Sequence, residues 1–349
     1  MHDALTALLH QRSSVQRQTW QSLWDQLDDG GLDRAEAIAL LASLATRLPD
    51  LETLRNLVAS LDERQPAVTD RWPGSVNIVG TGGGPKTFNI STASAFVAAA
   101  LGVRVVKTGS RAYASRYGSI DLLERLGVGL TNSYEQTTET LDRFGIAFAG
   151  HFVYPAALTR LARLIVPMSM RHFGRFLNAL GPFLAALPVT AQVTGVSEHA
   201  PLAELRQLAT TVSDRKIWLC TNDLGADELL GFADNTIYTG DSAGEVRLWR
   251  GRFTSGAGTL DDLRPAEAPG AVVEHFLAVV SGAANAVATR TVCLNAASLA
   301  VASGHTDDWA SAMIAAEDAV RSGAARRLLD RMRAQRQRPP SLAGAIGHG

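Results

Sequence analysis

The residues with the clearest chemical potential lie in one segment, VNIVGTGGGPKTFNISTASAF, residues 76–96. A β-branched run predicts a strand that ends at Val79, and glycines and polar residues separate it from an apolar helical stretch. These residues are Gly80, Gly82, Gly83 and Gly84, followed by Asn89, Ser91 and Thr92. Because glycine has no Cβ, its backbone N–H can approach an anion, and the helix N-terminus adds unpaired N–H groups. The segment predicts a phosphate site, although a plain strand–turn–helix connection has the same pattern.

A second group of polar residues follows the next predicted strand. Its hydroxyls and cations are Lys107, Ser110, Arg111, Ser115, Arg116 and Ser119. In a parallel sheet the carboxyl ends of neighbouring strands meet at one edge, where ligands bind in α/β folds. We therefore expect this loop and the glycine turn to face one crevice. The glycine spacing matches neither GxGxxG nor GxxxxGK[ST], so neither a dinucleotide fold nor a P-loop is indicated.

The elements that must position these loops alternate between strand and helix. The patterns predict strands over 75–79, 103–107 and 216–220, and helices over 91–101, 119–126 and 133–144. Strands separated by helices imply crossover connections and a mostly parallel sheet. Residues 268–336 are predicted to be helical, with an almost entirely apolar, buried helix over 285–303.

The first seventy residues have helical periodicity and no convincing strand. Asp33 and Glu36 have capping-box spacing at the start of one helix, and Asp50 can cap the next. Both helices have an apolar stripe that needs a partner surface. We predict a small helical domain over 1–70, a linker within 63–74, an α/β domain over 75–335, and a flexible tail over 336–349.

Composition excludes several classes of protein. The chain has 349 residues, 46% of them hydrophobic, and a net charge of -1. This apolar content excludes general disorder, and the near-neutral charge disfavours nucleic acid and membrane partners. Cys220 and Cys293 cannot make a disulfide framework, and no secretion signal or membrane span is evident, so we expect a cytoplasmic protein. Arginines within 326–338 are interpreted as a solvated helix face rather than a polyanion site.

Several motifs resemble those of the anthranilate phosphoribosyltransferase family (glycosyltransferase family 3). GTGGGPKTFNISTAS resembles the family's GTGGD…NxST motif, and KTGSRAYASRYGSIDLLERLG is similar to its KHGNR…GSxDxLExLG motif. NALGPF (178–183), GADE (225–228), LNAASL (294–299) and AVRSGAA (319–325) follow in the family's order. The resemblance covers residues 30–335 and identifies the chain as a divergent member.

The resemblance implies an architecture and a reaction. It implies an N-terminal helical domain and an α/β domain of the phosphoribosyltransferase and nucleoside phosphorylase type. Helices inserted around 130–175 would pack on the helical domain, and a homodimer would form through the helical domains. The reaction is Mg²⁺-dependent transfer of ribose 5-phosphate from phosphoribosyl pyrophosphate to the amine of anthranilate or a related aromatic acceptor.

The resemblance also assigns roles to residues of this chain. The donor would be held by Gly80, Thr81, Gly82, Gly83, Asn89, Ser91, Thr92, Lys107 and Ser119. Lys107 would also be catalytic, by neutralising charge, and Mg²⁺ would be bound by Ser91, Asp227 and Glu228. Hard Mg²⁺ prefers oxygen ligands and usually binds through one or two carboxylates and substrate phosphates. Without the resemblance, Asp227 and Glu228 would instead be interpreted as acids that begin a helix.

The sequence departs from the family where substrates bind. Gly84 replaces the acid of GTGGD, and Thr108 and Ser110 replace the His and Asn of KHGNR. The family's GxRTxFN is shortened to GRFLN, so the arginine that meets the anthranilate carboxylate is displaced, with Arg175 or Arg171 as candidates. Ser110, Arg175 and Arg171 are the predicted acceptor contacts. We expect donor binding to survive these changes and anthranilate to be a poor substrate.

Two other functions remain open from the sequence alone. A nucleoside phosphorylase could use the same glycine turn for inorganic phosphate, although the Asp227–Glu228 pair argues against it. A non-catalytic nucleotide- or nucleic-acid-binding protein could share the fold. We favour catalysis because Lys107, Ser91 and the acidic pair are retained. Efficient turnover of anthranilate would make the protein an ordinary enzyme of tryptophan biosynthesis.

Overall fold

The centre of the molecule is a seven-stranded sheet with the strand order β3-β2-β1-β4-β5-β6-β7. The computed structural model describes residues 1–337 apart from 12, 70, 110–117, 241–243 and 267. The strands are β1 (Trp72–Gly80), β2 (Arg104–Lys107), β3 (Ile146–Phe148), β4 (Val189–Gly195), β5 (Lys216–Asn222), β6 (Asn235–Tyr238) and β7 (Glu245–Leu248). The first five are parallel and β6 and β7 are antiparallel additions. The prediction of a mostly parallel sheet is confirmed, while β3, β4, β6 and β7 were not predicted.

Both faces of the sheet are covered, as the alternation of its side chains requires. On one face, Val105 and Ile78 join the core beneath α5 (Ile90–Ala100), α6 (Ser119–Leu126) and four C-terminal helices. These are α11 (Pro269–Val280), α12 (Ala286–Ala302), α13 (Trp309–Arg321) and α14 (Ala324–Gln337). On the other face, Val106 and Trp72 pack in a separate cluster. The predicted helix over 285–303 is confirmed as α12, whose N-cap is Asn285.

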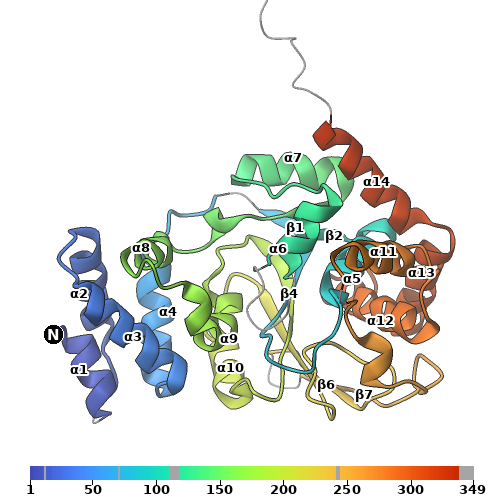
Figure 1. Ribbon diagram of the computed structural model, residues 1–349. Helices are drawn as coiled ribbons and strands as arrows, with labels where there is room; N and C mark the ends of the chain where they lie inside the picture. Colours follow the sequence, from blue (N-terminus) through green and yellow to red (C-terminus); the bar gives the residue numbers. More distant parts are fainter. Residues whose placement is uncertain (12, 70, 110–117, 241–243, 267, 338–349) are drawn as a thin grey trace, which may run out of the picture.

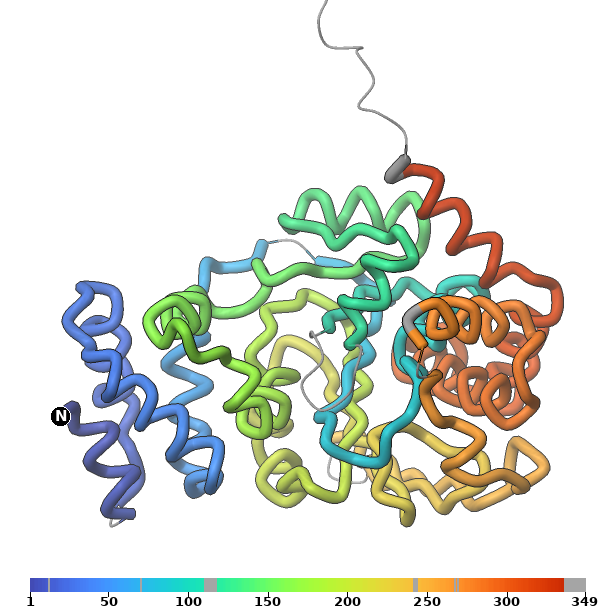
Figure 2. Tube along the Cα trace, in the orientation of Figure 1, coloured from blue at the N-terminus to red at the C-terminus, as the bar shows by residue number. Residues whose placement is uncertain are grey.

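The N-terminal residues form four helices at one end of the molecule (Figures 1 and 2). They are α1 (Asp3–His10), α2 (Arg17–Asp28), α3 (Arg34–Thr46) and α4 (Leu51–Asp62). Asp33 caps α3 and Asp50 caps α4, as predicted. The expected reciprocal half of the capping box is wrong: Glu36 accepts instead from the N–H of His2 and pairs with the chain's amino terminus. The positively charged amino terminus lies 3.0 Å from Glu36 Oε1 and attracts this carboxylate more strongly than the uncharged N–H of Asp33 would.

The helical end is joined to the sheet by helices from the middle of the chain. α8 (Ala156–Leu164) packs on α2 and α3, α9 (Gly174–Leu184) packs on α3 and α4, and α10 (Leu202–Ala209) packs on α4. Their apolar side chains share one core with the N-terminal helices. By contrast α7 (Tyr134–Phe144) packs on β3 and β2, away from the helical end. Only the later part of segment 130–175 therefore contacts the N-terminal helices.

Two further sequence expectations concern the ends and the surface. Helix α14 continues to Gln337, two residues into the tail expected from residue 336, and the remainder of that tail lies outside the described residues. Among the described helices, none has the length and apolar character needed to cross a membrane.

Candidate active site

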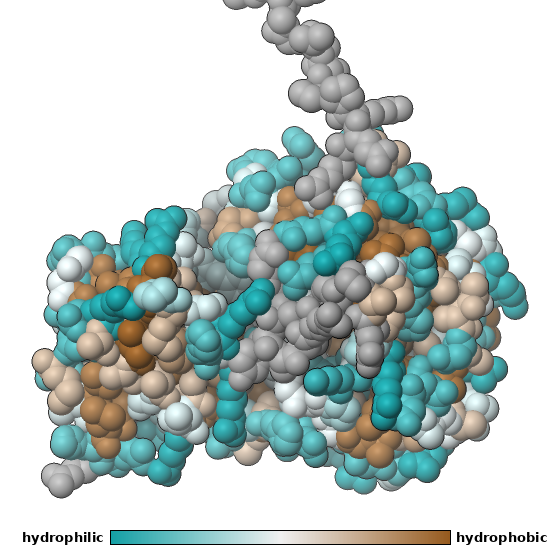
Figure 3. Space-filling model, viewed as in Figure 1, coloured by the Kyte–Doolittle hydropathy of each residue, from teal (hydrophilic) through white to brown (hydrophobic). Residues whose placement is uncertain are grey.

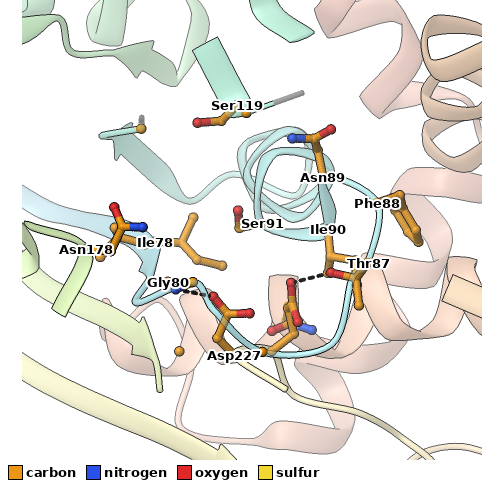
Figure 4. A pocket seen from close by; sticks show the side chains of 18 of the residues that line it. Ile78, Gly80, Thr87, Phe88, Asn89, Ile90, Ser91, Ser119, Asn178 and Asp227 are labelled. Atoms are coloured by element: carbon orange, nitrogen blue, oxygen red, sulfur yellow. Dashed lines mark hydrogen bonds between the residues drawn. The ribbon is translucent and has the colours of Figure 1, made fainter. Parts of the chain in front are cut away.

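A cavity of about 200 Å³ opens where β1 and β2 end and α5 begins. It brings together most of the predicted donor and metal residues, from three parts of the sequence: the β1–α5 connection, the region from the end of β2 to the start of α6, and the loop after β5. Those in its wall are Gly80, Gly82, Gly83, Asn89, Ser91, Lys107, Ser119, Asp227 and Glu228. Figure 4 shows Ser91 near the middle of this space, Asp227 at the bottom of it, and Asn89 and Ser119 at the top. We call this space the donor cavity.

The glycine turn after β1 can be formed only by residues without side chains. Gly82 and Gly83 have φ values of +63° and +83°, which L side chains rarely adopt. A Cβ on Gly80 would lie 2.2 Å from Asp227 Oδ2, and one on Gly84 would lie 2.8 Å from the carbonyl oxygen of Gly225. At Gly84 the turn is packed against the 225–228 loop. This packing leaves no room for the acidic side chain of the GTGGD motif, which Gly84 replaces in this chain.

Two predicted donor residues lie outside the wall of the donor cavity. Thr81 is 4% exposed, and its Oγ1 accepts a hydrogen bond from the N–H of Ser197. Thr92 is fully buried in α5, and its hydroxyl has no hydrogen-bond partner among the described residues. Thr92 therefore supports the helix rather than contacting a ligand, whereas Thr81 supports the turn and also lines a neighbouring cavity.

Lys107 lies at the end of β2 and is almost fully buried against the donor cavity. Its Nζ donates to the carbonyl oxygens of Ile78 at 2.9 Å and Thr108 at 3.2 Å. Burial lowers the pKa of the Lys107 ammonium to about 7, and the nearby charge of Asp227 offsets part of this shift. A phosphate in the cavity would favour the charged form of Lys107.

The acidic pair sits on the loop after β5, and Asn222 shapes that loop. The Asn222 amide donates to the carbonyl oxygens of Ala226 and Glu228, and its oxygen accepts from two backbone N–H groups. Asp227 Oδ2 accepts from the N–H of Gly82 at 2.9 Å, and Glu228 Oε1 accepts from the Thr87 hydroxyl at 2.9 Å (Figure 4). These two hydrogen bonds connect the 225–228 loop to the glycine turn at Gly82 and to Thr87, which lies before α5.

The environment of this pair suits a divalent cation. Burial raises the pKa of Asp227, and burial together with the charge of Asp227 raises the pKa of Glu228 well above its ordinary value. Glu228 Oε2 is buried and has no partner among the described residues. A cation would satisfy this oxygen and relieve the repulsion between the carboxylates. Within the described ranges no three His, Cys, Asp or Glu side chains gather for a metal, so hydroxyls, water and substrate would supply the other ligands.

A second cavity, of about 390 Å³, adjoins the donor cavity and reaches the helical end of the molecule. Gly82, Gly83 and Asn178 line both cavities, and Arg175, His199 and Leu48 line only the second. We call it the junction cavity. Arg175, one predicted acceptor contact, therefore lies beside the donor site. Arg171, on the 3-10 helix η2 (Met170–Phe173), is among the lining residues of neither cavity, and Ser110 lies outside the described residues.

Some residues of the site were not identified from the sequence. Asn178 was noted only as part of the NALGPF motif, yet it lies between the two cavities. His199 belongs to no motif, and Thr87 lies within the GTGGGPKTFNISTAS motif without an assigned role, so only the fold reveals their positions in the site. Thr108 was expected at the acceptor side but lines the donor cavity, where its N–H and hydroxyl both donate to Asn77 Oδ1. Its hydroxyl is committed to that buried amide rather than to the junction cavity.

Comparison with known proteins agrees with this architecture. Residues 73–326 match the model of the α/β domain of a glycosyl transferase family. The chain is 30% identical over 329 residues to an anthranilate phosphoribosyltransferase of Methylorubrum extorquens, an alignment that covers 93% of this chain and 96% of that protein. It is 31% identical over 317 residues to the enzyme of Geobacillus thermodenitrificans, covering 88% and 90% of the two chains.

Solved structures show the same fold. The anthranilate phosphoribosyltransferase of Thermus thermophilus superposes with a TM-score of 0.76 and 27% identity, covering 96% of this chain and all of that one. The enzyme of Saccharomyces cerevisiae, in complex with phosphoribosyl pyrophosphate and Mg, has a TM-score of 0.72 at 20% identity, with 92% of each chain covered. The chain described here therefore belongs to glycosyltransferase family 3, the family of the anthranilate phosphoribosyltransferases.

Proposed function

We propose that the protein transfers ribose 5-phosphate from phosphoribosyl pyrophosphate to the amine of a small aromatic acceptor, in a Mg²⁺-dependent reaction. The observation that carries this proposal is the donor cavity, which combines a glycine turn, a helix N-terminus, a buried lysine and an acidic pair. The relative from Saccharomyces cerevisiae, with the same fold, is described in complex with phosphoribosyl pyrophosphate and Mg.

Different residues of the chain would bind different parts of the donor. Backbone N–H groups of the glycine turn and of the start of α5 would bind pyrophosphate oxygens, and the hydroxyls of Ser91 and Ser119 would add further donors. Lys107 would place a positive charge at the base of the cavity. Asp227, Glu228 and Ser91 would hold Mg²⁺, which when bound neutralises charge on the pyrophosphate.

The reaction requires positioning more than acid–base chemistry. The acceptor amine forms a bond to the anomeric carbon of the ribose as the bond from that carbon to pyrophosphate breaks, and the amine then releases a proton to water. Charge grows on the departing pyrophosphate, where Lys107 and the preorganised N–H groups of the turn stabilise it. The junction cavity opens beside the turn, on a path by which an acceptor can reach the donor.

The acceptor proposed is an aromatic amine that carries an acidic group, anthranilate or a related compound. Arg175 lines the junction cavity, is exposed and forms no ion pair with any described residue, so its guanidinium is available to a carboxylate. Leu48 and Ala179 provide apolar surface in the same cavity for an aromatic ring.

We further propose a cytoplasmic homodimer that associates through the N-terminal helices. Apolar side chains gather over these helices on the face shown in Figure 3. Leu9 of α1, and Met1 before that helix, are more than half exposed. Both cysteines are buried and free, as suits a reducing compartment. Light scattering of the wild type and of Leu9→Glu tests the interface, and a monomeric wild type would contradict it.

A direct assay tests the proposed reaction. Purified protein is incubated with phosphoribosyl pyrophosphate, Mg²⁺ and a panel of aminobenzoates, and pyrophosphate release is followed. We expect release that requires Mg²⁺ and an acidic aromatic amine. Donor binding by calorimetry without turnover of any aromatic amine would favour the non-catalytic alternative, and phosphorolysis of nucleosides would favour a phosphorylase.

A further inference from the structure

We infer that Ser197 is a positioning residue for the anionic group of the donor, because it holds the Gly82–Gly83 peptide with its N–H available to the ligand. This inference rests on the proposed function. Ser197 follows β4, the strand between β1 and β5, and it is 3% exposed. It lines neither the donor cavity nor the junction cavity, so its action is on the turn and not on a ligand.

Two hydrogen bonds connect Ser197 to the turn. Its Oγ donates to the carbonyl oxygen of Gly82 at 2.7 Å, and its N–H donates to Thr81 Oγ1 at 3.1 Å. Thr81 itself donates its N–H to the carbonyl oxygen of Gly195, at the end of β4. Ser197 and Thr81 are both buried, so water competes little for the bond between them. The turn is therefore anchored to β4 at two consecutive residues.

The bond to the Gly82 carbonyl fixes the direction of the next N–H. In a trans peptide the carbonyl of one residue and the N–H of the next point in opposite directions across a rigid plane. With the Gly82 carbonyl held by Ser197, the Gly83 N–H points away from Ser197. Neither Gly83 N–H nor Gly84 N–H has a partner among the described residues. These two groups are the free donors that the turn offers to an anion.

Such a restraint is needed because glycines flank this peptide on both sides. Gly82 and Gly83 both have positive φ values, and glycine tolerates positive and negative φ about equally. Without the Ser197 hydroxyl, rotation of the peptide plane would present the Gly82 carbonyl oxygen to the ligand in place of an N–H. A carbonyl oxygen repels a phosphate, so the loss would fall on anion affinity.

The same segment ties the turn to the loop that carries the acidic pair. The N–H of Glu198 donates to the carbonyl oxygen of Gly225 at 3.1 Å. A Cβ on Gly84 would lie 3.1 Å from Ser197 Cβ and 2.8 Å from that same carbonyl oxygen. Ser197 and Glu198 therefore set the spacing between the N–H groups of the turn and the carboxylates at residues 227 and 228.

Calorimetry with pyrophosphate as the probe, in the presence of Mg²⁺, tests the inference on the full chain. We expect the wild type to bind pyrophosphate and Ser197→Ala to bind it on the order of tenfold more weakly, as for one lost hydrogen bond. Ser197→Thr keeps the hydroxyl and is expected to recover affinity. In the transferase assay, the KM for the donor rises in Ser197→Ala while the KM for the acceptor does not.

A matched control separates positioning from general stability. Ser303 is a buried serine at the end of α12 whose Oγ donates to the carbonyl oxygen of Ala300, so Ser303→Ala removes a similar bond far from the site. It is expected to keep wild-type affinity for pyrophosphate. If Ser197→Ala folds poorly, Thr81→Val removes the acceptor of the second bond and is expected to weaken pyrophosphate binding by a smaller factor.

The possible failures are distinguishable. Wild-type affinity in Ser197→Ala, or in Thr81→Val where that variant takes its place, overturns the positioning role of Ser197 and leaves the proposed function standing. A wild type that binds neither pyrophosphate nor phosphoribosyl pyrophosphate with Mg²⁺ overturns the proposed function, and with it this inference.

Discussion

The donor cavity and the junction cavity share three residues but are built in different ways. The donor cavity is formed by backbone and buried side chains that hold one another: Lys107 on two carbonyl oxygens, Asp227 on Gly82 and Glu228 on Thr87. The junction cavity is lined by exposed side chains, Arg175 and His199, where α9 and the β4–α10 loop meet the helical end. A substitution in the donor cavity therefore disturbs the groups that the replaced side chain holds. In the junction cavity, one side chain can be replaced without disturbing the others.

The acidic pair gives the strongest test of this difference. Asp227→Asn with Glu228→Gln keeps the shapes and the acceptor oxygens for Gly82 and Thr87 but removes both charges. We expect the Mg²⁺ dependence of donor binding to disappear, with a loss of affinity on the order of 10²-fold or more. Calorimetric titration of phosphoribosyl pyrophosphate with and without Mg²⁺ measures this loss.

The same double variant has a predicted effect on stability. Because burial raises the pKa values of both acids in the folded state, the wild type loses stability as the pH rises above the ordinary pKa values that these acids have in the unfolded chain. Without Mg²⁺, the variant should therefore melt at a higher temperature than the wild type near pH 8, and the gain should shrink as the pH falls. Asp223→Asn, an exposed position on the same loop, serves as the control. Unchanged Mg²⁺ dependence in the double variant would show that the metal site lies elsewhere.

Lys107→Met is expected to have the next largest effect. The variant should weaken donor binding by about 10- to 100-fold, as for the loss of charge-assisted hydrogen bonds. In the wild type the pKa of Lys107 is about 7, so donor affinity should fall as the pH rises from about 6 to about 8.5, and the variant should lose most of that dependence. Affinities measured across this pH range provide the test, and an equal slope in both proteins would remove Lys107 from the donor site.

Stability gives an independent measurement on the same residue. An unfolded chain keeps Lys107 protonated up to its ordinary pKa, whereas the folded chain does not, so this residue penalises folding most at low pH. The melting temperature of Lys107→Met relative to the wild type should therefore be higher at about pH 6 than at about pH 9. A difference that does not vary with pH would mean that burial does not lower the pKa of Lys107.

The same contrast explains what could be predicted from the sequence. The glycine turn follows β1 and Lys107 ends β2, so local pattern and the parallel topology predict that they share one cavity with Ser91. The acidic pair lies beyond the end of β5, and only the family resemblance assigned it to the site. His199 and Asn178 reach the site only through the packing of α9 and α10, which no local pattern encodes. The short strands β3, β6 and β7 were missed because three or four residues carry too little periodicity.

The acceptor side is expected to respond to a single side chain. Arg175→Ala should raise the KM for an acidic aromatic amine about tenfold and leave the affinity for phosphoribosyl pyrophosphate unchanged. Arg171→Ala, an exposed arginine on η2 that lines neither cavity, is the matched control and should change neither value. Steady-state kinetics with each variant measures both constants. A rise in the KM for phosphoribosyl pyrophosphate in Arg175→Ala would contradict the assignment of donor and acceptor to separate cavities. An equal rise in the acceptor KM in Arg171→Ala would contradict it as well.

The smallest expected effect concerns Thr92, a polar residue of the donor motif that the fold buries. Its hydroxyl is enclosed in α5 without a partner among the described residues, and an unsatisfied buried hydroxyl costs free energy of folding. Thr92→Val keeps the shape and removes that cost, so the free energy of unfolding should stay equal or rise by up to about 1 kcal/mol. Donor affinity should be unchanged, in contrast to Ser91→Ala, one residue earlier on the cavity wall, which should weaken it. Denaturant unfolding and calorimetry on both variants measure the two quantities. Weaker donor binding by Thr92→Val would show that α5 moves when the donor binds and exposes this hydroxyl, and the donor cavity would then be less rigid than its contacts indicate.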